Sequence, residues 1–419
     1  MDVSQAYLNA KMKEIVHMRL SPAVAKILIE RDPSYAQFLD HATGEVIVRL
    51  DKALYGCIES AKLWYDTISA KFIEMGYVVN PFDRCVFQKV TSEGIVTVCL
   101  YVDDIFATSK SESMLEGLIS DLQQVYELTI HRGTRHEYLG MVFEFSDDGT
   151  VYVSMEQYTR DVCKECGVTG TAAEPASSAL FTINPSFSVL NKQDSERFHR
   201  NVAQLLYMST RTRPDILLPI IFLSTRVRTP TAQDRIKLDR VLKYLAGTAE
   251  LGIRLGADSK GQLNIISYCD ASYGVHADMK SHSGIYISAG RGPIVAKSCK
   301  QKIVTKSSTE AELVTASDAS SLIAYQLNFL QSLGLEFQPA ILYQDNMSTM
   351  RLIDNGRSNS DRTKHIKLRY FFIKQYVDSG EFSVVYCPTE AMVADILTKP
   401  LHGEKFLQLR ALLLGHELP

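Results

Sequence analysis

The chain has 419 residues, of which 46% are hydrophobic and 22% charged, and its formal net charge is −3. This length and composition predict a globular protein of two or three domains, at about 150 residues per domain. The near-balanced charge neither establishes nor excludes nucleic-acid binding. The start lacks a basic region followed by an apolar core, and no stretch approaches the roughly 18 apolar residues of a membrane span. We therefore expect an intracellular protein of the cytoplasm or nucleus, with no signal peptide and no membrane partner.

The eight cysteines are scattered, without the dense spacing of a disulfide framework, so reduced thiols are expected. Cys163 and Cys166 form a CxxC pair, but a structural zinc site needs four ligands and no second pair stands at a suitable spacing. A metal site at these thiols is therefore not expected.

In the first part of the chain, helical periodicity alternates with strand-like runs. Apolar residues recur at helical spacing from Leu63 to Ile73, and this helix should end at Gly76. Two strands, at 85–90 and 95–101, flank a Thr-Ser-Glu-Gly turn and predict a hairpin. A helix at 114–126 and strands at 138–145 and 151–154 follow. The pattern predicts helices on an antiparallel sheet, an α+β unit.

The middle of the chain predicts helices, and the last third predicts a separate α/β unit. Residues 169–188 are rich in Ser, Thr, Ala and Pro, which is typical of a linker. Helices are expected at 198–210 and at 231–247, the second between a proline and a glycine. The α/β unit is expected to contain strands at 263–269, 284–287 and 294–298, a helix at 309–333, a strand at 341–344, a helix at 362–377 and a strand at 382–387.

Paired carboxylates mark the first candidate site. Asp103 and Asp104 stand at the end of the expected hairpin, and Asp2 lies far upstream on its own apolar segment. Like charges this close raise each other's pKa unless a cation intervenes, and their hard oxygen atoms suit Mg²⁺. An isolated Asp-Asp pair is usually a polar turn, so the surrounding sequence decides between a turn and a two-metal site for phosphoryl transfer.

The surrounding sequence resembles that of reverse transcriptases. The motif YVDD at 101–104 matches the Tyr-x-Asp-Asp box of that family, and DVSQAY at 2–7 is similar to the box with its other catalytic aspartate. The resemblance implies that Asp2, Asp103 and Asp104 are catalytic and hold two ions of Mg²⁺, with Mn²⁺ as the alternative. It also implies that Tyr7 contacts the sugar of an incoming deoxynucleoside triphosphate.

Further motifs resemble the Ty1/copia type of retrotransposon. They are LYG at 54–56 leading to WY at 64–65, YLGM at 138–141, RPDI at 213–216 and LKYLAGT at 242–248. By this resemblance Gly56 belongs to the substrate-binding surface. Copia elements usually continue after this glycine with Leu-Lys-Gln, whereas this chain has Cys57-Ile58-Glu59, which exchanges a cation for a carboxylate. We expect this exchange to lower the efficiency of polymerisation.

Four dispersed carboxylates, Asp270, Glu312, Asp345 and Asp395, mark the second candidate site. Singly, each would be a solvated side chain. Together, within the segments CDAS, STEAEL, YQDN and ADILTKP, they resemble the catalytic, metal-binding site of RNase H, again with two ions. Glu310 competes with Glu312, but residues two apart on a helix point about 200° apart, so one site takes one of them. The Ala-Glu-Leu setting favours Glu312.

Basic residues adjoin these carboxylate motifs. Lys297, Lys300 and Lys302 are expected to bind the phosphates of an RNA/DNA hybrid, the alternative being a solvated charged face. A second basic group is expected in the same track: Arg357, Arg362, Lys364, His365, Lys367 and Arg369.

The resemblance covers the whole chain and implies its organisation. It predicts a reverse-transcriptase palm at 1–165, a linker and helical thumb or connection at 166–257, an RNase H-like domain at 258–402 and a tail at 403–419. Polymerases of this family carry basic fingers before the first aspartate, and Asp2 follows Met1 directly, so an amino-terminally truncated region is expected. The main hypothesis is an RNA-directed DNA polymerase with RNase H, acting on an RNA template, an RNA/DNA hybrid and deoxynucleoside triphosphates. The alternatives are a chain active only as RNase H, which the truncation favours, and a non-catalytic remnant.

Overall fold

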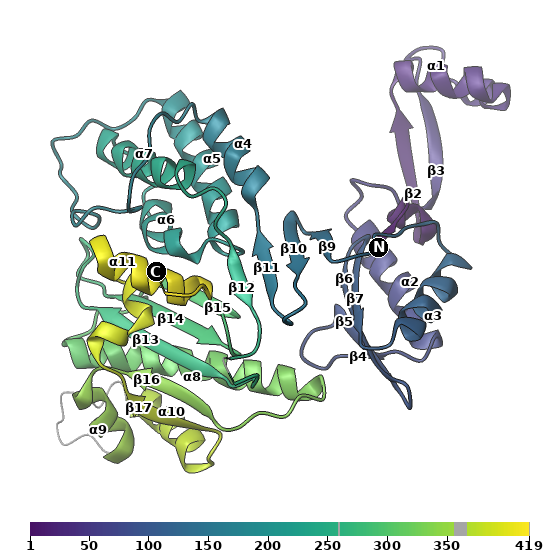
Figure 1. Ribbon diagram of the computed structural model, residues 1–419. Coiled ribbons are helices and arrows are strands. Elements are labelled where there is room, and N and C mark those ends of the chain that lie inside the picture. The colour runs from purple at the N-terminus through teal and green to yellow at the C-terminus, as the bar shows by residue number, and fades with distance from the viewer. Residues whose placement is uncertain (259, 356–366, 419) are drawn as a thin grey trace. The chain divides into compact units, whose positions relative to one another are not determined.

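The computed structural model describes residues 1–258, 260–355 and 367–418, without the side chains of residues 367, 368 and 370 (Figure 1). The chain divides into two compact units, Met1–His131 and Arg132–Pro419. The division between these units falls before residue 165, where the expected palm ends. Residues 132–165 belong to the second unit because their strands pair with a strand about a hundred residues later in the chain.

A six-stranded antiparallel sheet in the order β4-β5-β6-β7-β1-β8 forms the first unit. Its strands are β1 (Asp2–Val3), β4 (Val78–Val79), β5 (Val86–Thr91), β6 (Gly94–Tyr101), β7 (Asp104–Ser109) and β8 (Leu128–Thr129). The helices α2 (Ser60–Glu74) and α3 (Glu112–Gln123) contribute Ile68, Phe72 and Leu122 to its apolar core. The predicted hairpin and the helix end at Gly76 are confirmed, since Gly76 has a φ of 85° in the left-handed region.

A two-stranded ribbon extends this unit with elements that the sequence pattern did not predict. The strands β2 (Lys11–Leu20) and β3 (Val46–Lys52) pair antiparallel, and between them lie α1 (Pro22–Arg31) and the 3-10 helix η2 (Pro33–Phe38). Ile15 and Ile47 of the ribbon are mostly exposed. The ribbon therefore buries too little apolar surface to show the alternation typical of a core strand.

The second unit begins with a four-stranded sheet and a helical layer. The strands are β9 (Arg135–Tyr138), β10 (Met141–Phe145), β11 (Val151–Ser154) and β12 (Ile253–Leu255), in the order β12-β11-β10-β9. Leu139 and Gly140 both have positive φ and make the turn that divides the strand expected at 138–145 into two. The helices are α4 (Glu156–Glu165), α5 (Lys192–Ser209), α6 (Leu217–Ser224) and α7 (Ala232–Ala246), with the 3-10 helix η3 (Pro214–Ile216).

A five-stranded sheet in the order β15-β14-β13-β16-β17 completes the second unit. Its strands are β13 (Ile266–Ser272), β14 (His282–Ser288), β15 (Val295–Lys300), β16 (Ala340–Gln344) and β17 (Phe382–Tyr386). The first three are antiparallel, whereas β16 runs parallel to both β13 and β17. Parallel neighbours end at the same edge of a sheet. Residues at the carboxyl ends of β13 and β16 are therefore brought together.

Helices cover both faces of this sheet (Figure 1). Ile285 and Ile287 of β14 pack with α8 (Ser308–Ser332), and Tyr286 between them packs with the cluster that contains α6. The remaining helices are α9 (Met347–Asn355), α10 (Lys367–Asp378), the 3-10 helices η5 (Thr389–Ala391) and η6 (Val393–Leu397), and α11 (Gly403–Leu414). In the described part of the chain, no helix combines the length and the apolarity needed to span a membrane.

The segment expected as a tail is a packed helix. Phe406, Leu409 and Leu413 of α11 are buried in the same cluster as α5, α6 and α7. Residues 166–191, which include the segment 169–188 expected as a linker, contain no helix or strand, and Leu180 within them is buried. All eight cysteines are free thiols.

Two buried histidines of the second unit form a hydrogen-bonded chain. His276 Nε2 lies 3.0 Å from His282 Nδ1, and His282 Nε2 lies 2.7 Å from Ser298 Oγ. Phe181 and Phe222 cover the rings, and Lys300 and Asp278 are the charged groups that act on His276. Burial lowers the pKa of His276 to about 4 and that of His282 to about 3. Both rings are therefore neutral in the folded protein at neutral pH.

We expect acid to destabilise the second unit through these rings. Below about pH 6.5 these two histidines are protonated in the unfolded chain but stay neutral in the folded protein. The free energy of unfolding therefore falls as the pH falls below that value. The loss is about 1.4 kcal/mol per pH unit for each ring. Denaturant unfolding from pH 7 to pH 5 checks this: His282→Asn should reduce the slope of stability against pH, whereas an unchanged slope would contradict it.

Candidate functional site

The structure places Asp2, Asp103 and Asp104 at one end of the six-stranded sheet. Asp103 lies in the turn between β6 and β7, and Asp104 begins β7 and is paired with Asp2 of β1. Directly paired residues of antiparallel strands point to the same face of a sheet, so the Asp2 and Asp104 side chains share a face. Burial raises the pKa of Asp104, and the charges of Asp103 and Asp2 raise it further.

A tryptophan holds the turn that carries these aspartates. The buried Trp64 of α2 donates its Nε1 hydrogen to the Val102 carbonyl oxygen at 2.5 Å. Val102 has a φ of 55°, which a β-branched residue rarely adopts, so the bond stabilises a strained residue directly before Asp103. In the sequence, Trp64 stands in a subfamily motif that suggested no role for it. Its signal was that it is the single tryptophan of the chain, because a buried indole usually finds an acceptor.

Two tyrosines lie beside the same aspartates. Tyr7 lies in the 3-10 helix η1 (Ala6–Asn9), and its ring centroid is 4.4 Å from that of Tyr55. Burial raises the pKa of Tyr55, and the charge of Asp103 contributes, so this aromatic pair adjoins the carboxylates. Gly56 has a φ of 98° with open space around it, so the backbone conformation favours glycine there. Ile58, in the segment that departs from the copia pattern, is fully exposed.

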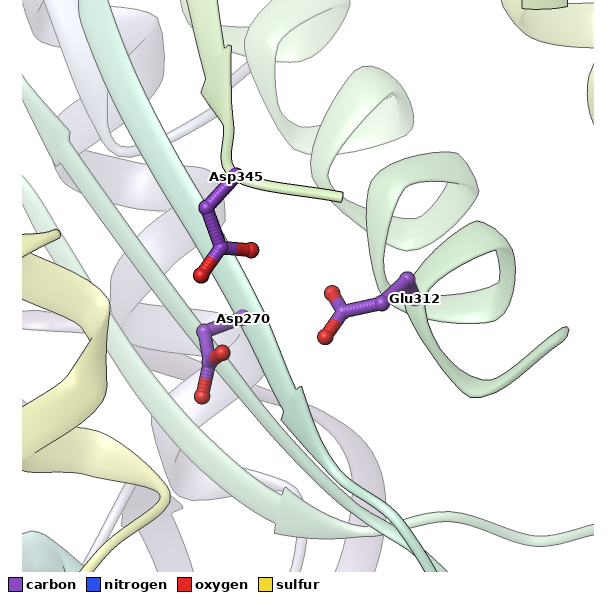
Figure 2. Close-up of side chains that lie close together, drawn as sticks. All are labelled: Asp270, Glu312 and Asp345. Carbon is purple, nitrogen blue, oxygen red and sulfur yellow. The ribbon is translucent and has the colours of Figure 1, made fainter. Parts of the chain in front are cut away.

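Three carboxylates of the second unit converge on one point (Figure 2). Asp270 lies in β13, Glu312 in the second turn of α8, and Asp345 directly after β16. Each offers one oxygen atom, and these three atoms all lie within 4.8 Å of one another. Among the described residues, this is the one group of three or more potential metal ligands whose atoms lie within that distance. The oxygen atoms of Asp2, Asp103 and Asp104 are therefore more widely spaced than those of this group.

Neutral donors hold two of these carboxylates. Glu312 accepts hydrogen bonds from the Ala271 amide at 3.2 Å and from the Gln344 side chain at 3.4 Å, and Asp345 accepts from the Thr389 hydroxyl at 3.2 Å. Neither carboxylate forms an ion pair within the described ranges. Burial raises the pKa of Glu312 well above its ordinary value, and the charges of Asp270 and Asp345 raise it further. Such crowding of hard oxygen ligands fits a divalent cation.

Asp395 lies outside this group, although its motif led us to expect a metal ligand. It is buried, and both of its oxygens are occupied: Lys399 Nζ lies 2.6 Å from Oδ1 and Lys405 Nζ lies 2.9 Å from Oδ2. In the structure these two ammonium groups neutralise the Asp395 carboxylate, and its role as a metal ligand stays a prediction. The sequence concealed the arrangement because Lys405 belongs to the segment expected as a tail.

The side chain and the amide of Glu310 form hydrogen bonds at the start of α8. Its Oε2 accepts the Lys306 amide at 2.7 Å, and its own amide donates to the Ser307 side chain, which caps the helix. Glu310 is absent from the carboxylate group, as expected from the helical geometry.

The three predicted lysines line a hollow of about 640 Å³. Lys297 and Lys300 lie on β15 and Lys302 just beyond it, and Tyr325 and Arg369 line the same hollow. Lys300 is paired with Asp278 at 2.8 Å and Arg369 with Asp318 at 2.9 Å. Lys297 and Lys302 form no ion pair within the described parts of the chain. Of the second basic group, Arg357, Arg362, Lys364 and His365 lie outside the described residues, as does the side chain of Lys367.

Comparisons with known proteins identify a family and several similar proteins. Residues 1–177 match the family described as "Reverse transcriptase (RNA-dependent DNA polymerase)". The retrovirus-related Pol polyprotein from transposon RE2 of Arabidopsis thaliana is 31% identical over 412 residues, covering 97% of this chain and 27% of that protein. The putative transposon Ty5-1 protein of Saccharomyces cerevisiae is 27% identical over 322 residues, covering 76% of this chain and 98% of that protein. The solved structure of LC11-RNase H1, isolated from compost, is 16% identical with a TM-score of 0.25, covering 32% of this chain and 91% of that chain.

An antiparallel sheet with a YVDD turn, followed by a mixed five-stranded α/β module with clustered carboxylates, defines the class: a reverse transcriptase with an RNase H-like module. The relatives then specify the type. Residues 1–177 match the reverse transcriptase family, and 97% of the chain is similar to Pol polyproteins of copia-type retrotransposons. It spans 27% of the length of the RE2 polyprotein.

Proposed function

We propose that this chain is a divalent-metal-dependent enzyme that cleaves the RNA strand of RNA/DNA hybrids and carries the catalytic residues of an RNA-directed DNA polymerase. The observation that carries the ribonuclease proposal is the convergence of Asp270, Glu312 and Asp345 within 4.8 Å. Two of these carboxylates lie in a buried setting, where like charges are costly without a cation.

Mg²⁺ is the ion that the donor set suits best, with Mn²⁺ as the alternative, because all three ligands are carboxylate oxygens. The bound ion would lower the pKa of an attacking water and polarise the phosphate. The protein's own contribution is to fix the ligands: the Ala271 amide and the Gln344 side chain orient Glu312, and the Thr389 hydroxyl orients Asp345.

The lysine-lined hollow supports a polyanionic substrate. Lys297 and Lys302 present ammonium groups without acidic partners among the described residues, and the exposed Tyr325 offers an aromatic face in the same hollow. Phosphate contacts of this kind supply most of the sequence-independent affinity of nucleic-acid binding. In the proposal they hold the backbone of the hybrid while the carboxylates act on its RNA strand.

The pairing of Asp2 with Asp104 beside Asp103 supports the polymerase site. There the three aspartates would hold two Mg²⁺ ions for transfer of a nucleotide onto a primer paired with an RNA template. Tyr7, in contact with Tyr55 beside these aspartates, would contact the sugar of the deoxynucleoside triphosphate. Gly56 belongs to the same substrate surface.

The test is cleavage of a labelled RNA strand in a hybrid, beside single-stranded RNA, and extension of a DNA primer on an RNA template. We expect Mg²⁺- or Mn²⁺-dependent cleavage of the hybrid that Asp345→Asn removes and Asp354→Asn, an exposed matched control, leaves intact. Extension should be the weaker activity, because the polymerase carboxylates are more widely spaced, and Asp103→Asn should remove it. Cleavage that survives Asp345→Asn, or fails with both ions, would refute the ribonuclease assignment.

A further inference from the structure

Lys399 connects Asp395 to the carboxylate group. Its Nζ lies 3.1 Å from Asp270 Oδ1 and 2.6 Å from Asp395 Oδ1. The Lys399 amide also donates to the Asp395 carbonyl oxygen at 2.8 Å, so the two residues are joined through backbone and side chain. The ammonium group thus lies between two buried carboxylates.

Asp270 is shared between this lysine and the metal-binding group. Its Oδ2 accepts the Thr398 hydroxyl, its Oδ1 pairs with Lys399, and one of its oxygens belongs to the group with Glu312 and Asp345. In two-metal sites a carboxylate commonly bridges two ions about 4 Å apart. Here the same carboxylate bridges the place for one ion and an ammonium group.

The net charge of the carboxylates and lysines in this region is balanced by one divalent ion. Four carboxylates, Asp270, Glu312, Asp345 and Asp395, meet two ammonium groups, Lys399 and Lys405, which leaves two negative charges unbalanced. One divalent ion cancels that remainder. A second would bring an excess of positive charge and would compete with Lys399 for Asp270 and Asp395.

We propose that this RNase H-like module holds one divalent ion, on Asp270, Glu312 and Asp345, and that Lys399 supplies the positive charge that a second ion supplies in two-metal sites. Lys399 is then a positioning residue that acts through Asp270. Asp395 orients Lys399, and Lys405 balances the outer oxygen of Asp395. The proposal rests on the ribonuclease function proposed above.

The test counts Mn²⁺ ions bound to the full chain by electron paramagnetic resonance. Asp103→Asn and Asp104→Asn in every sample remove the ligands of the first unit. We expect one ion per chain with Lys399 present and two with Lys399→Gln, because the substitution frees an oxygen on each of two carboxylates. The second ion should lie close enough to the first to give a spin-coupled signal.

Two control variants distinguish the effect of the Lys399 charge from a structural effect of the substitution. Lys399→Arg keeps the cation and should bind one ion, and it serves if Lys399→Gln folds poorly. Lys374→Gln removes another lysine with an aspartate four residues away, at 3.0 Å, and should also leave one ion. Two ions with Lys399 present, or a single ion that persists in a well-folded Lys399→Gln variant, would overturn the proposal for Lys399. No ion at all, or binding that ignores Asp345→Asn, would overturn the proposed metal site itself.

Discussion

Glu312→Gln is expected to lower the rate of hybrid cleavage by about 10³-fold, the order of loss that follows removal of one charge-stabilising group from a catalytic centre. The substitution keeps the length of the side chain and its ability to accept a hydrogen bond from the Ala271 amide. It removes one of three negative charges that hold the ion. The substitution therefore leaves the fold largely undisturbed, and the expected loss of rate reports weaker metal binding.

Glu310→Gln is the matched control, because it makes the same change two residues earlier on the same helix, also at a buried position. Glutamine still accepts the Lys306 amide, so cleavage should stay within a few-fold of the unchanged protein. Steady-state cleavage of a labelled hybrid, with the Mg²⁺ concentration varied, separates weak ion binding from slow chemistry. A larger loss for Glu310→Gln than for Glu312→Gln would exchange the roles of the two residues.

Periodicity in the sequence predicted several of the elements that carry the two sites. The strand that ends just before Asp103 and Asp104 and the helix of Glu312 were placed within a few residues of their bounds, because each has a strong local pattern and clear turn or cap residues. The strand β7, which begins at Asp104, was not predicted. The meeting of Asp270 with Asp345 depends on a parallel pairing of β13 with β16 across about 70 residues. No local pattern encodes such a pairing, so only the family resemblance suggested it.

The features that local sequence patterns missed depend on tertiary contacts. β11 pairs with β12 across the whole helical layer, which places residues 132–165 in the second unit. The Asp395 carboxylate was expected to bind a metal because its motif fits, whereas its second lysine partner, Lys405, becomes visible only once α11 packs beside η6. In both cases tertiary contacts, rather than local propensity, decided the outcome.

Residues of the copia-type motifs RPDI and LKYLAGT form buried polar contacts with one another. Arg213 and Asp215 are fully buried and form a bidentate pair, with distances of 3.0 and 2.8 Å. Arg213 also donates to the Thr248 carbonyl oxygen at 2.7 Å, and the Tyr244 hydroxyl donates to Asp215 at 2.6 Å. Arg410 of α11 reaches the Tyr244 hydroxyl at 3.2 Å. The two motifs therefore join η3, α7 and α11 through one buried polar network.

Arg213→Met should lower the free energy of unfolding of the second unit by about 3–5 kcal/mol, because it leaves the buried Asp215 carboxylate without its cation. Arg160→Met is the control: Arg160 and Glu156 also form an ion pair, at 2.7 Å, but both are exposed, and such pairs contribute about 1 kcal/mol or less. Denaturant unfolding of the full chain, followed by a probe of the second unit, measures both changes.

The double variant Arg213→Met, Asp215→Leu distinguishes an uncompensated charge from lost packing. Removing both partners takes away the stranded carboxylate, so the double variant should recover part of the stability that Arg213→Met loses. The Thr248 carbonyl oxygen and the Tyr244 hydroxyl would each have lost a partner, which is why recovery should be incomplete. The ion pair would not be the source of the effect if Arg213→Met lowered the free energy of unfolding no more than Arg160→Met does. The same would follow if the double variant lost more stability than Arg213→Met and Asp215→Leu lose together as single variants. The motifs would then stabilise this unit through apolar packing of Tyr244 and Ile216, both of which are buried in the same cluster.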